Sequence, residues 1–237
     1  MAGGANAQDS LRAVEKKIQA AWEQVSTLVA SVKMESHLPV GEDDVVAQGE
    51  GQLEYLKAEP KAKYRQQMKI SIPPPLSMEA GFEFLFDGEA LYLMNEVMGQ
   101  MTIAKADAPD LEKGALPPGG GPLLDALKSE MQLSVLPEMD VDGRSAYVLE
   151  GKRRRGDPHD PVQRAVFYID KENGIQRRVE FFSADGALNT RIDYSGFKLN
   201  IPIDAQRFVY TGPQPPEESG DDSNVPEPTP APEVKVP

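Results

Sequence analysis

Two histidines, His37 and His159, are the only imidazoles in a chain of 237 residues that contains no cysteine. The absence of thiols excludes disulfide scaffolds, thiolate zinc sites, iron–sulfur clusters and cysteine nucleophiles. Two imidazoles cannot build a histidine-rich metal site, and a Ser-His-Asp triad would have to use one of them. Both histidines stand near prolines in stretches typical of loops, without a nucleophilic serine motif beside them. The sequence therefore predicts a protein that is not an enzyme and holds no metal or cofactor.

Two short motifs have the residue types of a ligand loop but lack part of its pattern. Gly119-Gly120-Gly121 is not followed by the lysine and the serine or threonine of a phosphate loop, so we interpret it as a flexible connection. Asp140-Val141-Asp142-Gly143 lacks the later acidic ligands of a calcium loop. We interpret it as a hairpin turn.

The strongest positive cluster is Lys152-Arg153-Arg154-Arg155. One interpretation is a solvated hairpin loop. The other is a docking patch formed by Arg153, Arg154 and Arg155 for an acidic partner or an anionic head group.

Acidic residues outnumber basic ones, with 38 aspartates and glutamates against 25 lysines and arginines, for a formal net charge of −13. This balance argues against nucleic acid as a partner, because binding to phosphate needs a positive face. Residues 213–237 hold six acidic residues against one lysine, and eight of the 21 prolines. We expect this segment to be a disordered tail, because it has almost no large apolar residues to bury. One domain then covers 10–212.

Residues 1–9 are expected to be a disordered N-terminus. Ala5-Asn6-Ala7 before Gln8 has the small-x-small form of a signal-peptidase site, so this stretch is interpreted as the remnant of a signal peptide. A plain small-residue terminus is the alternative. No run of 18 apolar residues exists, so no transmembrane segment is expected.

Hydrophobic periodicity predicts two helices, at about 10–32 and 123–131, the second preceded by the glycine triplet and Pro122. Elsewhere, apolar and polar residues alternate between tight turns, which indicates about nine antiparallel strands in a meander. The predicted strands are 49–57, 64–72, 82–86, 91–103, 132–136, 146–152, 162–170, 175–182 and 188–198, and a short tenth segment, 208–210, closes the list. So long a meander twists and curls on itself, so the fold class is α+β: a strongly curved antiparallel sheet whose concave face is covered by the helices.

Methionines gather in 91–103, where Met94, Met98 and Met101 stand close together. They suit either a packed core or an apolar cleft that accepts an acyl chain on the concave face of the sheet. A shift of one residue in register would move every strand residue chosen for such a cleft to the other face. The side chains predicted to line the cleft are Tyr64, Met68, Ile70, Phe84, Phe86, Leu91, Leu93, Leu124 and Leu127.

The order and spacing of several motifs over roughly 11–213 resemble the periplasmic carriers of outer-membrane lipoproteins, the LolA-like group. Residues 25–36 are similar to the end of that group's opening helix and its first strand, and 123–131 match the position of its lid helix. The other matching motifs are Gly49-Glu50-Gly51-Gln52-Leu53 with the later Pro60, Asp87-Gly88-Glu89-Ala90-Leu91-Tyr92 with Asn95 and Gln100, and Asp193-Tyr194 through Phe197, Asn200, Asp204, Phe208 and Pro213.

The resemblance implies a half-open antiparallel barrel with helices as a lid, in a soluble, exported protein of the periplasm. A carrier with one mouth can work as a monomer, which is the state we expect, although the sequence leaves the oligomeric state open. Such a chaperone binds the acyl chains of lipoproteins or other lipids in an apolar cavity. It receives them from an inner-membrane release complex and transports them to an outer-membrane acceptor, without making or breaking a bond. Related lipid-binding sheets also serve as sensors that regulate a membrane signalling protein, and the sequence leaves this alternative open.

This chain departs from the LolA-like pattern at several positions. The arginine that ties the lid shut in many members is replaced by Glu59, so that form of lid control does not carry over. Tyr92 takes the place of the usual tryptophan, and Met94 and Glu96 replace the tyrosine and proline that follow it.

Overall fold

The computed structural model describes residues 4–40, 43–59, 61–97, 100–106, 118–154 and 162–212. Its two α-helices are α1 (Gly4–Trp22) and α2 (Gly120–Glu130), and a 3-10 helix, η1, spans Ala205–Phe208. The strands are β1 (Thr27–Val40), β2 (Asp43–Leu56), β3 (Lys63–Ile72), β4 (Met78–Phe86), β5 (Leu91–Val97), β6 (Gln100–Ala106), β7 (Met131–Val141), β8 (Arg144–Arg153), β9 (Arg164–Asp170), β10 (Gln176–Phe182) and β11 (Leu188–Leu199).

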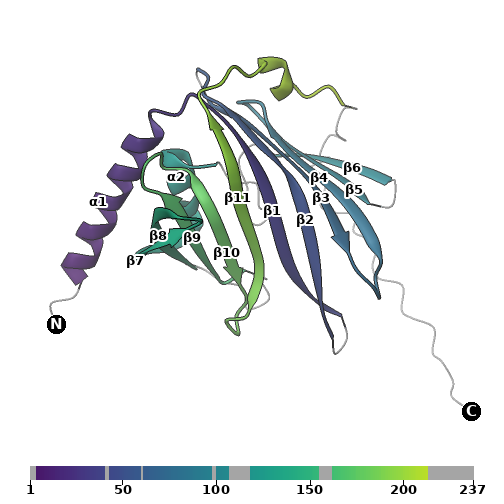
Figure 1. Ribbon diagram of the computed structural model, residues 1–237, viewed down its shortest axis with the longest axis horizontal. Helices are drawn as coiled ribbons and strands as arrows, with labels where there is room; N and C mark the ends of the chain where they lie inside the picture. The colour runs from purple at the N-terminus through teal and green to yellow at the C-terminus, as the bar shows by residue number, and fades with distance from the viewer. Residues whose placement is uncertain are drawn as a thin grey trace, which may run out of the picture.

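All these strands form one antiparallel sheet in the order β6-β5-β4-β3-β2-β1-β11-β10-β9-β8-β7. Two meanders are thus joined where β1 pairs with β11, with Leu28 opposite Leu199. The sheet curls strongly, with α2 inside the curve and α1 along the side of β7–β10 (Figure 1). Its edges, β6 and β7, are not paired with each other, so the barrel stays half open. The predicted fold class is confirmed.

The first helix is shorter than its apolar periodicity predicts. It ends at Trp22, and β1 starts at Thr27, so Val25 and Val29 lie outside the helix. β-Branched residues favour extended structure, and Val29 and Val32 lie in β1, where Leu28 and Val32 face the core. The helix also begins at Gly4, within the stretch that was expected to be disordered.

The segment 91–103 is not one long strand, as predicted, but parts of β5 and β6, which pair as a hairpin. The apolar run conceals this reversal, because Met98-Gly99 contains a turn-favouring glycine but is not one of the dipeptides, such as Asn-Gly or Asp-Gly, that mark a tight hairpin turn. The predicted strand at 208–210 is likewise wrong, because η1 ends at Phe208 and the chain is irregular after it. The hairpin turn at Asp142-Gly143 is confirmed, with both residues at positive φ.

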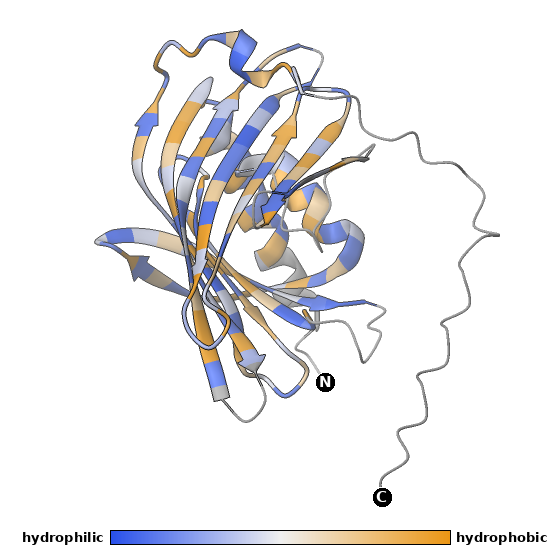
Figure 2. Ribbon diagram, turned by 90° about the vertical axis from the view of Figure 1, so that its right-hand side faces the viewer, coloured by the Kyte–Doolittle hydropathy of each residue, from blue (hydrophilic) through white to orange (hydrophobic). Residues whose placement is uncertain are grey.

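Polar and apolar side chains alternate along the strands, so each face of the sheet has its own character (Figure 2). The concave face belongs to one large apolar cluster that also includes side chains of α1 and α2. The convex face carries ion pairs, such as Arg65 with Glu83 at 2.6 Å and Arg178 with Asp193 at 2.5 Å. None of the described helices combines the length and apolarity needed to cross a bilayer.

Candidate functional site

The register of the strands arranges the concave face in rows of side chains. In one row, Tyr64 lies opposite Tyr55 on β2 and Phe86 on β4, and Phe86 lies opposite Leu91 on β5. The rings of Tyr64 and Phe86 pack with their centroids 5.3 Å apart. Three aromatic rings on β2–β4 and a leucine on β5 thus lie side by side on the concave face.

The adjacent rows continue the same face. The next row consists of Leu53 on β2, Gln66 on β3, Phe84 on β4 and Leu93 on β5, each opposite the one before it. In the row after that, Met68 lies opposite Gly51. A Cβ at position 51 would lie 1.8 Å from the carbonyl oxygen of Gln67, so only glycine fits the close approach of β2 and β3 there.

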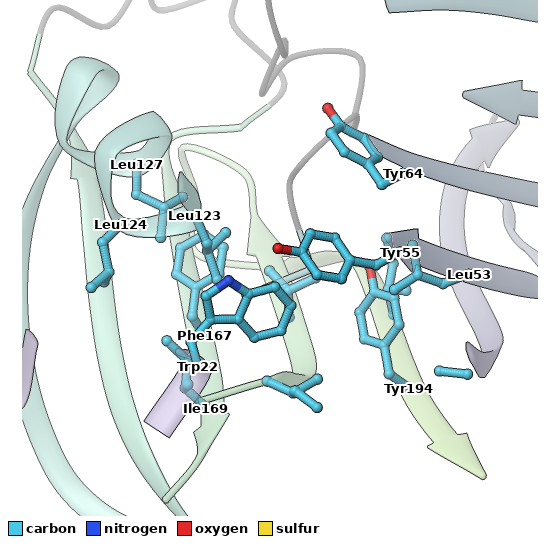
Figure 3. Close-up of a cluster of buried hydrophobic side chains, with 14 of the residues drawn as sticks. Trp22, Leu53, Tyr55, Tyr64, Leu123, Leu124, Leu127, Phe167, Ile169 and Tyr194 are labelled. Carbon is cyan, nitrogen blue, oxygen red and sulfur yellow. The ribbon is translucent and has the colours of Figure 1, made fainter. Parts of the chain in front are cut away.

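Helix α2 contributes Leu123, Leu124 and Leu127 to the same cluster, and all three are buried. Trp22, at the end of α1, lies between these leucines and the sheet, and the hydroxyl of Tyr55 points toward its indole (Figure 3). The Trp22 and Tyr55 rings are 4.7 Å apart. The end of α1, the helix α2 and the concave face therefore form one continuous apolar interior.

Both ends of α2 are attached to the sheet. On its N-terminal side, Gly119 forms a β-bridge with Ile175, and the Gln176 amide donates to the Pro118 carbonyl at 3.0 Å. At its C-terminal end the helix continues directly into β7. The close packing of the glycine triplet in this junction was not foreseen from the sequence.

The structure brings together most of the residues predicted to line a cleft. Seven of them are buried members of the main cluster, with exposed fractions between 0% for Leu91 and 9% for Phe86. Phe84 is partly buried and packs against them. Ile70 shares their face but is half-buried at the far end of β3, where it lines a hollow with Leu76. Their role in binding a ligand remains a prediction.

The interior is closed in this structure, because the lining side chains are buried among the protein's own residues. A hollow of about 570 Å³ lies instead at β2–β5 among side chains such as Gln67, Lys69 and Glu83, whose positions alternate with those of the concave face. Met94 also lines that hollow and lies opposite Glu83, so it belongs to the convex face, whereas the side chains of Met98 and Met101 lie outside the described residues. An acyl chain could enter this interior only if the helices packed against the concave face moved away from it.

Several interior residues escaped the sequence-based choice, including Trp22, Leu53, Tyr55 and Tyr194. Leu53 and Tyr55 alternate within a strand that was predicted beside 64–72 in the meander, but the register of that pairing was not predicted. Tyr194 joins the interior through the pairing of β1 with β11, where it lies opposite Val32. That pairing connects residues more than 150 positions apart in the sequence.

The tyrosine hydroxyls buried in the interior are uncharged. Burial raises the pKa of the Tyr64 and Tyr194 hydroxyls far above the usual value, and it raises the pKa of Tyr55 as well. These groups therefore stay neutral at physiological pH. The arrangement suits an uncharged, apolar ligand.

The three arginines of the predicted docking patch differ in their surroundings. Arg153 is largely buried and forms an ion pair with Glu130 at 2.6 Å, which ties β8 to the end of α2. Arg154 is exposed, and its Nε donates to the Met131 carbonyl at 3.1 Å. Arg155 lies outside the described residues, and the docking role stays a prediction.

His37 lies near the end of β1, away from the apolar cluster. A hydrogen bond from its ring to Asp44 raises the pKa of His37. His159 falls outside the described residues. Within the part of the chain that the structure describes, no three histidine, aspartate or glutamate side chains gather as metal ligands.

No protein-family model matches this chain. Among curated proteins, it is similar to an uncharacterized protein of Methanocaldococcus jannaschii, with 22% identity over 211 residues. The match covers 89% of this chain and 54% of that protein, so the chain spans about half the length of this relative.

Solved structures also show a likeness. A putative outer membrane lipoprotein-sorting protein domain from Vibrio parahaemolyticus is 13% identical, with a TM-score of 0.41, over 83% of this chain and 94% of that one. A chain in the complex of Pseudomonas aeruginosa MucA and MucB is 14% identical, with a TM-score of 0.43, and the match covers 87% of this chain and 61% of that one. The half-open antiparallel barrel that the resemblance implied is the architecture described above. At these identities the likeness concerns the fold alone.

Proposed function

We propose that this protein is a periplasmic carrier that binds the acyl chains of lipoproteins in the interior of its half-open sheet. The observation that supports the proposal is the continuous apolar cluster shared by the concave face and α2. The residues chosen for a cleft by alternation alone fall into or against that cluster, with Ile70 as the exception. Each methylene of an acyl chain buried there would contribute about 0.8 kcal/mol to binding.

Loading requires the interior to open, because its apolar side chains are buried in the closed state. Opening exposes these side chains to water, and an acyl chain that takes their place restores the lost apolar contacts. The cost of opening keeps the affinity moderate, and a carrier must release what it has bound. The same cost favours a ligand with more than one chain.

Native mass spectrometry of the full chain, mixed with a synthetic dipalmitoylglyceryl lipopeptide and freed of detergent, tests the proposal. We expect a one-to-one complex with the lipopeptide. Trp22, the only tryptophan, lies inside the cluster, so its fluorescence should change when the lipopeptide binds. Absence of both the complex and the fluorescence change would overturn the proposal.

Leu124→Glu provides the matched test of the interior. Leu124 is buried on α2, and a carboxylate there should weaken lipopeptide binding about tenfold or more. Ser129→Glu, at an exposed position of the same helix, is the control and should bind as the natural chain does. Phe84→Ser, at a partly buried position of the concave face, supplies a second test if Leu124→Glu fails to fold.

The alternative function is that of a lipid-binding sensor that regulates a membrane signalling protein. Phosphatidylglycerol and lipopolysaccharide, offered in the same measurement, separate the two functions. Binding of one of these lipids without binding of the lipopeptide would favour the sensor.

A further inference from the structure

Gln66 interrupts the apolar concave face at its centre. It lies on β3 between Tyr64 and Met68, with Leu53 opposite it on one side and Phe84 on the other. Gln66 is only 5% exposed. A polar side chain buried among apolar neighbours normally has strong hydrogen-bond partners.

The hydrogen bond that Gln66 makes is a weak one. Its Nε2 donates to the thioether sulfur of Met68 at 3.1 Å, and a thioether is a poor acceptor. The next glutamine along the strand shows the contrast. Gln67 points to the convex face, where its Nε2 donates to a carboxylate oxygen of Glu83 at 2.8 Å. An amide with so weak a partner is available to a better acceptor.

An acyl chain brings such an acceptor into the interior. Fatty-acyl esters and amides carry a carbonyl oxygen at the head of an otherwise apolar chain, and Met68 is flexible enough to release the amide. We infer that the Gln66 amide donates a hydrogen bond to the acyl carbonyl of the bound ligand and so selects acyl esters and amides over plain alkyl chains. This inference rests on the proposed acyl-chain binding and adds a specificity-determining residue to it.

The test compares a dipalmitoylglyceryl lipopeptide with its dihexadecyl ether analogue, in which methylenes replace the ester carbonyls. The full chain should bind the ester about three- to tenfold more tightly than the ether, the range of one neutral hydrogen bond. Gln66→Leu should bind both lipopeptides equally, because it retains the apolar surface but has no donor. Gln67→Leu is the matched control on the convex face and should keep the preference for the ester.

The outcomes distinguish the role of Gln66 from acyl-chain binding itself. Equal binding of ester and ether by the natural chain would overturn the role of Gln66 while leaving acyl-chain binding intact. An unchanged preference in Gln66→Leu would overturn it as well. Failure of both lipopeptides to bind would refute the proposed function itself. Gln66→Asn, which keeps the amide on a shorter side chain, serves as a second variant if Gln66→Leu does not fold.

Discussion

At Gly51, the absence of a side chain allows β2 and β3 to approach each other closely. Replacing Gly51 with alanine would place a Cβ 1.8 Å from the carbonyl oxygen of Gln67, and both are backbone-bound atoms that cannot rotate away. We expect Gly51→Ala to lower the free energy of unfolding by about 2–3 kcal/mol, as overpacking does. Urea denaturation measures the difference.

Gly81→Ala on β4, which is separated from β2 by β3, is the control for this prediction. Its added Cβ would come no closer than 3.7 Å to Glu96, an ordinary contact. Its unfolding midpoint should stay near that of the natural chain. Equal midpoints for both variants would show that the close approach at Gly51 does not limit the sheet.

At the scale of elements, the junction between α1 and α2 holds the two helices together. Gly120 has φ of +64°, and a Cβ there would lie 2.1 Å from the indole of Trp22. Gly120→Ala should therefore displace Trp22, shift its fluorescence to longer wavelength and destabilise the protein by about 2–3 kcal/mol.

Gly121→Ala, one position further along, provides the comparison. Its added Cβ meets nothing closer than 3.8 Å, and alanine is the better helix former by up to about 1 kcal/mol. It should leave the fluorescence of Trp22 unchanged and preserve or raise stability. An unshifted spectrum in Gly120→Ala would contradict the packing of the junction.

At the scale of the whole molecule, the chain after β11 fastens to the convex side of the sheet. Phe208 is fully buried, and Arg207 forms an ion pair at 2.7 Å with Glu54 of β2, whose side chain is 8% exposed. Tyr210 stacks on Tyr92 of β5 with 4.2 Å between ring centroids. This segment, residues 201–212, thus connects the end of the second meander to the first.

Two truncated chains test where the folded domain ends. A chain that stops at Gly212 should unfold at the same urea concentration as the full chain, because 213–237 are expected to bury no core. A chain that stops at Asn200 loses Phe208 and should be destabilised by at least about 3 kcal/mol. Equal stability of all three chains would show that residues 201–212 do not stabilise the sheet. If the chain that stops at Gly212 were less stable than the full chain, the folded domain would extend into residues 213–237.

Local patterns determined much of this protein. Alternation with a period of two assigned Tyr64, Met68, Phe84 and Phe86 to one face, and Asp142-Gly143 marked a turn, because both features depend only on neighbouring residues. The curved antiparallel sheet with few helices followed from the number of such strands and turns.

Only the tertiary structure decided how those strands meet. The pairing of Leu28 with Leu199, the reversal between β5 and β6, and the ion pair of Arg153 with Glu130 leave no local pattern. The weak hydrogen bond of Gln66 is likewise invisible until the register places it among apolar neighbours. A strand's own residues specify which side chains share a face, whereas the partners across that face are selected by packing over the whole chain.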